Sequence, residues 1–340
     1  MFVFPGQGAQ WPGMGAQLLD TSPVFRQAIT DCAHALAPHI DWDLEHVLRD
    51  TDPHALDRVD IVQPALWAMM IGLTRCWEHL GITPTAVIGH SQGEIAAAHI
   101  AGILTLEDSA RIIALRSQLI RHHLTGHGGM ATANLPADTL TDHYLPAYPH
   151  IHIAAHNSPH HTALAGDQTQ LHQLLQQLHT DGIKARLLPV DYPSHTHHTE
   201  ALHQDLLDAL APITPHHGHT PLHSTLTTQP VTGTDLTPAY WYNNLRNPVR
   251  LTQTLTRLTD EGHHTYLEPS PHPTLTTPIH HTNPQATTIH TLTRNQHTPH
   301  PLHTAHATAW THGQPTTWPH PHTTTHTPLP TYPFQHKHHW

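Results

Sequence analysis

The 340-residue sequence predicts an α/β fold from three observations. Short apolar runs that end in Gly or Pro are typical of buried strands entering turns, as at Phe2–Phe4 and Ala86–Gly89. Stretches with helical spacing of apolar residues follow them. A Gly-x-Ser-x-Gly motif lies between the second strand and the helix after it, and its serine is the first candidate for a functional side chain.

The helices of the first part follow from spacing and end signals. Ile61, Ala65, Met69 and Leu73 recur near one helix face, and Pro64 suits an early helical position, so we expect a helix over roughly 63–80, ended by a glycine. Residues 94–98 favour the start of a second helix. A third is expected over about 107–121, with acidic residues in its first turn.

The second part has a different pattern. Strands are expected at Met130–Ala133 and Ile151–Ala155 and a helix at Gln168–Leu178, which predicts a small α+β insertion. After about residue 290 the chain is rich in Thr, His and Pro. This composition favours an extended segment that lies on another surface and is not an independent domain.

Composition excludes several classes of protein. The 14 Lys and Arg against 25 Asp and Glu give a formal charge of −11, which argues against a nucleic-acid partner. No apolar run approaches the roughly 18–20 residues that span a membrane, and the start does not resemble a secretion signal. Two cysteines without a CxxC pattern suit a reducing compartment, so we expect a cytoplasmic protein with no membrane partner.

Histidine is unusually abundant. Of the 43 histidines, 31 lie in residues 151–340, with clusters at 195–198, 216–219 and 336–339. Without an HExxH pattern, an accompanying cysteine set or a fixed spacing, these clusters predict no functional metal site. We also expect solubility to be lowest near the sequence pI of about 6.4.

The Gly-x-Ser-x-Gly motif spans residues 89–93. In a strand-turn-helix context it projects Ser91 Oγ into a cleft and directs the Gln92 backbone N–H toward a developing oxyanion. A serine hydroxyl needs a histidine base, and the motif itself does not select one of the 43. His90 either contacts substrate or packs beneath the turn.

Five motifs in order resemble those of malonyl-CoA:ACP-type acyltransferases, most of all the acyltransferase domains of modular type I polyketide synthases. They are Phe4-Pro5-Gly6-Gln7-Gly8-Ala9-Gln10, Val62-Gln63-Pro64, Gly89-His90-Ser91-Gln92-Gly93-Glu94, Ala114-Leu115-Arg116-Ser117 and Tyr192-Pro193-Ser194-His195. The resemblance implies an α/β-hydrolase-like large subdomain at 1–125 and 192–290. It also implies a ferredoxin-like small subdomain inserted at 126–191 and a post-acyltransferase linker at 291–340, in which Leu329–Gln335 resembles the linker that follows such domains.

The same resemblance implies the roles of the site residues. Ser91 would be the nucleophile, His195 its base, and the backbone amides of Gln7 and Gln92 the oxyanion hole. The imidazole would be oriented by a main-chain carbonyl, for which the segment 247–250 is the candidate. Ser91 in an ordinary turn and His195 as one more surface histidine remain the alternatives.

Arg116 matches the arginine that pairs with the substrate's free carboxylate, which suits the bidentate geometry of guanidinium. Pairing with a nearby acid on a solvated helix face is its alternative. Gln63, Gln92 and Tyr192 resemble methylmalonyl-selective domains, and the acyl pocket would consist of Gln63, Tyr192, Pro193 and Ser194. Pro193 departs from the usual alanine and stiffens the loop, so ethylmalonyl and malonyl units stay open.

The function implied is transfer of an extender unit from acyl-CoA to the phosphopantetheine thiol of an acyl carrier protein, with no permanently bound cofactor. Neighbouring ketosynthase and linker domains of a longer synthase would be further partners. Two other classes remain: a serine hydrolase or thioesterase, which would lack the need for Arg116, and a noncatalytic interaction module with a His-rich tail.

Overall fold

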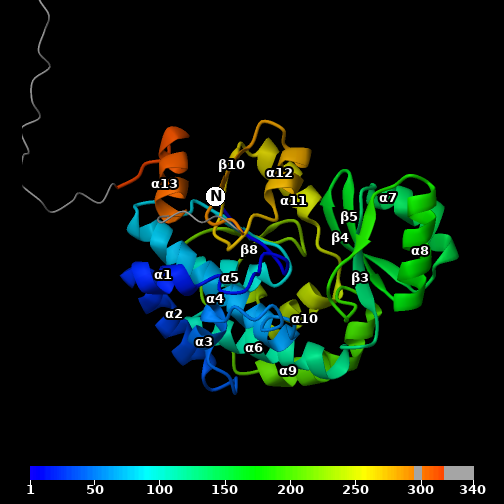
Figure 1. Ribbon diagram of the computed structural model, residues 1–340, viewed down its shortest axis with the longest axis horizontal. Helices are drawn as coiled ribbons and strands as arrows, with labels where there is room; N and C mark the ends of the chain where they lie inside the picture. The colour runs from blue at the N-terminus through cyan, green and yellow to red at the C-terminus, as the bar shows by residue number, and fades with distance from the viewer. Residues whose placement is uncertain (295–300, 318–340) are drawn as a thin grey trace, which may run out of the picture.

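The computed structural model describes residues 1–294 and 301–317 and contains two β-sheets (Figure 1). The larger has six strands in the order β10-β9-β1-β2-β7-β8, parallel except for the β7-β8 pair. Its strands are β1 (Phe2–Phe4), β2 (Val87–Gly89), β7 (Leu222–His223), β8 (Pro230–Val231), β9 (Thr265–Glu268) and β10 (Thr287–His290). Because β1 and β2 are adjacent and parallel, the turns that follow them meet at one edge of the sheet.

Most helices pack around this larger sheet, as Figure 1 shows. The helix α4 is buried over nearly its whole surface and contacts α2, α5 and α6. The bounds are α1 (Ala16–Thr21), α2 (Pro23–Leu36), α3 (Leu44–Arg49), α4 (Val59–His79), α5 (Gly93–Ile100), α6 (Leu106–His123), α9 (His203–Leu210), α10 (Pro238–Arg246), α11 (Leu251–Asp260), α12 (Thr276–Thr282) and α13 (Pro301–Thr311).

The smaller sheet lies at one end of the molecule, with α8 packed on it (Figure 1). It is antiparallel in the order β4-β5-β3-β6. Its elements are β3 (Gly129–Ala133), α7 (Ala137–Thr139), β4 (Ile151–Ser158), β5 (His161–Gly166), α8 (Gln168–Thr180) and β6 (Ala185–Leu187). The sequence predicted β3, β4 and α8 but not β5 or β6.

A shared core fixes the two sheets against each other. Ala155 and Ala163 of the small sheet belong to the same apolar cluster as Val3, Ile88 and Val249 from the large-sheet side. Small side chains allow close approach of the two backbones, and Ala155 forms a parallel bridge with Val249. The cleft between the sheets therefore has a rigid floor.

Two expectations from sequence are wrong in detail. The helix expected from about 63 begins at Val59, so Pro64 lies inside it and not in its first turn. The expected extended segment after 290 contains the helix α13, because Leu302, Ala305 and Ala309 form an apolar face at helical spacing that packs on the main core. The motif at 329–335 lies outside the described residues.

Among the described residues, no helix is both long and apolar enough to cross a membrane.

Candidate active site

The Gly-x-Ser-x-Gly turn joins the end of β2 to the start of α5. Ser91 has a φ of 53°, a left-handed conformation that a side chain rarely adopts and that projects its Oγ away from the turn. A Cβ on Gly89 would lie 2.2 Å from Glu94 Cα, and one on Gly93 would lie 2.3 Å from the carbonyl oxygen of Phe4. Gly89 is therefore required for the close approach of β2 to α5, and Gly93 for the close packing of the elbow against β1.

Ser91 and His195 meet although 104 positions separate them. Ser91 Oγ lies 3.0 Å from His195 Nε2, and His195 Nδ1 lies 2.8 Å from the carbonyl oxygen of Asn247. A carbonyl only accepts, so Nδ1 carries the proton and Nε2 is left as an acceptor facing the serine hydroxyl. The carbonyl comes from the segment that the sequence suggested.

His195 is held in an environment that disfavours its charged form. Burial, aided by the positive charge of Arg116, lowers its pKa to about 3. Its backbone N–H donates to Leu245 O at 2.9 Å, and its φ is 63°. The imidazole is therefore neutral and fixed in orientation at neutral pH, which is the form a general base requires.

The backbone amides of Gln7 and Gln92 lie at the edge where β1 and β2 end. Both residues line the same cavity as Ser91. Across the described chain, neither backbone N–H has a hydrogen-bond partner. Gln92 immediately precedes α5, so its N–H lies at the positive end of a helix. Two free donors beside a serine hydroxyl can stabilise a developing oxyanion.

Arg116 is buried and has no acidic partner within residues 1–294 and 301–317. Its Nη1 donates to Gln63 Oε1 at 3.3 Å, while its Nε has no partner. Burial lowers its pKa to about 10, which still leaves it charged at neutral pH. The solvated ion pair considered from sequence is therefore wrong, and the guanidinium is a buried cation without a counter-ion.

The predicted acyl-pocket residues divide into two groups. Gln63, Tyr192 and Ser194 line the cavity, and Tyr192 OH donates to Gln7 Oε1 at 2.6 Å and accepts from Gln63 Nε2 at 3.3 Å. Pro193 is buried but does not line the cavity, since its ring packs near Gly128. Of the loop at 192–195, only Pro193 is therefore turned away from the cavity.

The cavity that unites these residues has a volume of about 270 Å³. Its floor comes from the ends of β1 and β2 and from α4 and α6. Its opposite wall comes from the small sheet, through residues such as Met130, Ala155 and Ala163. A small, partly apolar cavity with a nucleophile, a base and a buried arginine can hold a short acyl group that carries an anion.

Comparisons with known proteins agree with this site. The family model of the acyl transferase domain matches residues 1–315. The chain belongs to that family. It is 45% identical over 344 residues to the pikromycin polyketide synthase component PikAII of Streptomyces venezuelae, covering 100% of this chain and 9% of that protein. Erythronolide synthase EryA3 of Saccharopolyspora erythraea is 43% identical, covering 98% of this chain and 11% of that protein.

The acyltransferase chain thus spans about a tenth of the length of these curated relatives. Among solved structures, it resembles the acyltransferase domain from module 8 of the salinomycin polyketide synthase with a TM-score of 0.89 and 44% identity. That match covers 93% of this chain and 76% of the other. The fold class and the resemblance predicted from the motifs are confirmed.

A carboxyl group beneath the elbow of this acyltransferase was missed from sequence. Glu94 is fully buried and accepts hydrogen bonds from Tyr240 OH, from the Thr225 backbone N–H at 3.3 Å and from Asn244 Nδ2 at 3.4 Å. Burial raises its pKa to about 7. Because Thr225 Oγ1 donates to Gly89 O at 2.7 Å, this network supports the turn. In the sequence, the only sign of this role was that Glu94 directly follows the Gly-x-Ser-x-Gly motif.

His90, left open from sequence, lies partly buried between the two halves of the cleft. Its Nε2 is 2.8 Å from Asn157 Oδ1 of the small sheet, and its Nδ1 has no partner in the described part of the chain. It also lines the cavity. The side chain therefore both links the two sheets and faces the substrate space.

One group of potential metal ligands also lay outside the sequence clusters. Ligand atoms of His223, Glu261 and His263 fall within 4.8 Å of one another. Arg257 lies among them, with its Nη2 2.7 Å from His223 Nδ1 and its Nη1 bonded to Glu261. A guanidinium at this point already supplies the positive charge, so these residues do not suit a metal ion.

Proposed function

We propose that this acyltransferase loads a methylmalonyl-type extender unit from acyl-CoA onto the phosphopantetheine thiol of an acyl carrier protein, through an acyl-Ser91 intermediate. One observation carries the proposal: Ser91 Oγ lies 3.0 Å from His195 Nε2 in a cavity that also contains a buried arginine, which has no carboxylate partner in the part of the chain that the structure describes.

In the first half-reaction, Ser91 Oγ attacks the thioester carbonyl while His195 Nε2 takes its proton. The oxygen of the tetrahedral intermediate faces the backbone N–H groups of Gln7 and Gln92. Collapse of the intermediate breaks the carbon–sulfur bond, and the protonated Nε2 returns its proton to the departing CoA sulfur. The products are acyl-Ser91 and free CoA.

Arg116 couples substrate choice to this proton transfer. Its charge contributes to the low pKa of His195, so the free enzyme resists forming the imidazolium. A substrate carboxylate bound to Arg116 neutralises that charge and raises the pKa of His195 in the complex. An acetyl group supplies no such charge. We therefore expect Arg116 to affect the rate of acylation as well as binding.

The second half-reaction repeats the first in reverse, with the carrier's pantetheine thiol as the nucleophile. His195 takes the thiol proton, the new carbon–sulfur bond forms, and Ser91 Oγ recovers its proton. No resident cofactor is needed. The carrier protein and neighbouring ketosynthase and linker domains would be the partners, and the proposed subdomain boundaries remain 1–125 with 192–290, 126–191 and 291–340.

The choice of extender would depend on the cavity wall beside the α-carbon. Gln63, Gln92, Tyr192 and Ser194 line it, and Gln92 contributes a buried amide whose oxygen and nitrogen have no partner in the described residues. A single methyl contributes only about 1–3 kcal/mol to discrimination. Methylmalonyl is therefore proposed as the preferred unit, with ethylmalonyl and malonyl as competitors.

Intact-protein mass spectrometry after brief incubation with equimolar malonyl-, methylmalonyl-, ethylmalonyl- and acetyl-CoA tests the proposal. We expect a methylmalonyl adduct that is absent in Ser91→Ala. In Arg116→Ala, its rate of formation should fall about 100-fold, since a charge-assisted pair contributes about 1.5–3 kcal/mol. Arg49→Ala, which removes an exposed arginine of α3, is the matched control and should acylate normally.

Other adducts distinguish the alternatives. A malonyl or ethylmalonyl adduct would keep the transfer and overturn the assignment of the extender. Rapid CoA release without an adduct would indicate a serine hydrolase or thioesterase. If neither an adduct nor CoA release occurred in the wild type, the transfer itself would be wrong and a noncatalytic role would remain.

A further inference from the structure

The loop that follows β1 carries the backbone amide of Gln7, one of the two donors that line the cavity beside Ser91. Gly8 comes directly after it, with a φ of 133° and nothing within 4 Å of the position of a Cβ. A glycine in open space rotates more easily than any other residue. Because both ends of the loop are fixed, rotation at Gly8 also turns the neighbouring Gln7 peptide. The direction of the Gln7 N–H therefore depends on what holds the loop beyond Gly8.

An arginine from the other end of the chain holds this loop. Arg294 Nη2 donates to Gln10 O at 2.9 Å and to Gly8 O at 3.3 Å. Within residues 1–294 and 301–317, these two carbonyls accept from no other donor, and Arg294 pairs with no carboxylate. One guanidinium nitrogen therefore bridges the carbonyls on either side of Ala9 and closes the turn that begins at Gly8.

The backbone of Arg294 is anchored to the segment 268–275, which follows β9. Its N–H donates to His272 Nδ1 at 3.2 Å, and the Leu292 N–H donates to Ser270 O at 3.4 Å. Burial, followed by the positive charge of Arg294, lowers the pKa of His272, so its imidazole is neutral at neutral pH and Nδ1 can accept. Leu292 is buried in the main core. The guanidinium therefore extends from a fixed point.

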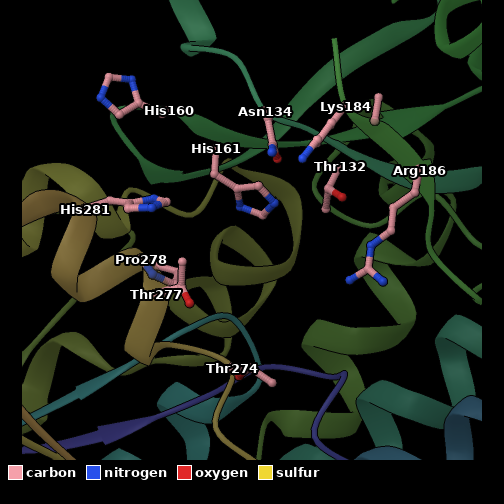
Figure 2. A pocket seen from close by; sticks show the side chains of 11 residues that line it. Thr132, Asn134, His160, His161, Lys184, Arg186, Thr274, Thr277, Pro278 and His281 are labelled. Atoms are coloured by element: carbon pink, nitrogen blue, oxygen red, sulfur yellow. The ribbon is translucent and has the colours of Figure 1, made fainter. Parts of the chain in front are cut away.

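The segment after β9 is itself rigid and reaches the catalytic cavity. Glu268 is buried and accepts hydrogen bonds from the backbone N–H groups of Thr274 at 2.8 Å and Leu275 at 3.1 Å. Thr274, labelled in Figure 2, lines the catalytic cavity and also a larger cavity of about 510 Å³. Trp11 Nε1 donates to Pro271 O at 3.0 Å. This segment thus supports the loop after β1 and forms part of the cavity wall.

We propose that Arg294 is a positioning residue for the oxyanion hole. By bonding to Gly8 O and Gln10 O, it fixes the loop after β1 so that the Gln7 N–H stays directed at the oxygen that develops on the substrate carbonyl. The proposal rests on the proposed transfer function for the role of Gln7. It gives a task in the reaction to a residue of the segment 291–340, which was assigned from sequence to a linker.

Two contacts act on opposite sides of the bond between Gln7 and Gly8. Tyr192 OH donates to Gln7 Oε1 at 2.6 Å and fixes that side chain, whereas Arg294 fixes the backbone beyond Gly8. Tyr192 lines the cavity, so its loss would affect binding and rate together. Arg294 is exposed and does not line the cavity. Loss of Arg294 should therefore lower the rate and leave binding of the substrate unchanged.

Kinetics of Ser91 acylation in Arg294→Ala test this role. We expect kcat to fall about tenfold, because the loop loses two hydrogen bonds to a charged group, while KM and the Kd for free CoA stay unchanged. Arg294→Lys keeps a charged donor and should retain part of the rate. Guanidinium ion, added below denaturing concentrations, should restore part of the rate of Arg294→Ala, because the position is open to solvent.

Arg26→Ala is the matched control. Arg26 is also exposed and also donates to two backbone carbonyls, Leu19 O at 2.6 Å and Asp20 O at 3.0 Å, but none of these residues lines the catalytic cavity. Both variants should lose similar stability in urea unfolding, and only Arg294→Ala should lose rate and respond to guanidinium. An equal loss of rate in the two variants would overturn the proposal, as would a rise in KM at unchanged kcat.

A boronic acid tests the oxyanion hole without acyl transfer. With 2-carboxyethylboronic acid, Ser91 Oγ bonds to boron, its proton passes to His195, and the negatively charged boron places a hydroxyl oxygen at the oxyanion position. We expect the Kd of this adduct to rise about tenfold in Arg294→Ala, as for the rate, and to stay unchanged in Arg26→Ala.

The boronic acid also separates this proposal from the proposed function. An equal Kd in the wild type and Arg294→Ala would overturn the positioning role, even if acyl transfer occurs. A wild type that transfers no acyl group, but binds the boronic acid in a way that depends on Ser91 and Arg294, would refute the transfer and keep the positioning role.

Discussion

The two sides of the cleft differ in how they hold charge. On the large-sheet side, His195 and Arg116 are almost fully buried, and each has a strongly lowered pKa caused by burial. On the small-sheet side, Lys184, Arg186 and His281 are exposed. The first set is fixed by neighbours from several helices and loops, whereas the second extends from one edge strand and one short helix.

The buried side suits chemistry, and the exposed side suits the binding of a hydrated ion. A buried site strengthens every electrostatic interaction in it and excludes water, which suits the making and breaking of an ester. An exposed site binds a hydrated anion at little desolvation cost and releases it readily. If this division is right, changes in the buried side should affect stability and rate strongly, and changes in the exposed side should affect binding moderately.

The largest effect is expected on the free energy of unfolding, when Gly93→Ala on the large-sheet side is compared with Gly182→Ala on the small-sheet side. In Gly93→Ala, the new Cβ would lie 2.3 Å from Phe4 O and 2.4 Å from Pro5 O, both backbone atoms that cannot move without shifting β1. We expect destabilisation of about 3 kcal/mol or more. In Gly182→Ala, nothing lies within 4 Å, and only the φ of 77° is unfavourable, which costs about 1 kcal/mol.

Urea unfolding of both variants measures these free energies. The contrast between Gly93 and Gly182 would be broken if the two substitutions destabilised the protein equally. That result would mean that the elbow can relax away from β1, and that its close packing is not what holds Ser91 in place.

The second effect is a loss of stability in acid, which comes mainly from the buried side. Burial lowers the pKa of His99 and His223 to about 4 and that of His195 to about 3, from the usual 6.5. Burial raises the pKa of Glu94 and Glu268 to about 7 from 4.5. The histidines favour the folded state at high pH, and the carboxyls favour it at low pH.

Between pH 6.5 and 4.5, the unfolded chain binds protons at the three histidines and the folded chain binds them at the two carboxyls. For these five groups alone, the difference of one proton lowers the free energy of unfolding by about 1.4 kcal/mol per pH unit as the pH falls. Below pH 4.5 the carboxyls are protonated in both states, so the loss steepens until about pH 4. Urea unfolding at pH 7, 5.5 and 4.5 checks the sign, and stability that rose on acidification would contradict it.

Much of the buried side could be predicted from sequence, because its chemistry depends on local motifs. The strand-turn-helix context identified Ser91, and the order of five motifs selected His195 from many histidines. The structure brings these two within hydrogen-bond distance and buries Arg116 beside them. Short-range signals and a family resemblance were sufficient here.

The exposed side could not be predicted, because it depends on strand register. β5 and β6 were not expected, so nothing indicated that Lys184 and Asn134 would be neighbours or that α12 would face them. The helix α13 was hidden by a Thr- and His-rich composition, although Leu302, Ala305 and Ala309 carry its apolar face. Composition describes a surface well and long-range pairing poorly.

The smallest effect is expected at the seam between the two sides, in Pro193→Ala. Pro193 does not line the catalytic cavity, and its ring packs near Gly128, where the chain enters the small sheet. Because Tyr192 and Ser194 face the cavity instead, we expect the ratio of methylmalonyl to ethylmalonyl adducts to change by less than about threefold, under 1 kcal/mol.

Tyr192→Phe, which removes the hydroxyl that bonds to Gln7 and Gln63, is the comparison and should change the ratio more. Competition mass spectrometry measures both ratios. A larger change in Pro193→Ala than in Tyr192→Phe would mean that the extender is selected by the rigidity of the 192–195 loop and not by the side chains that line the cavity.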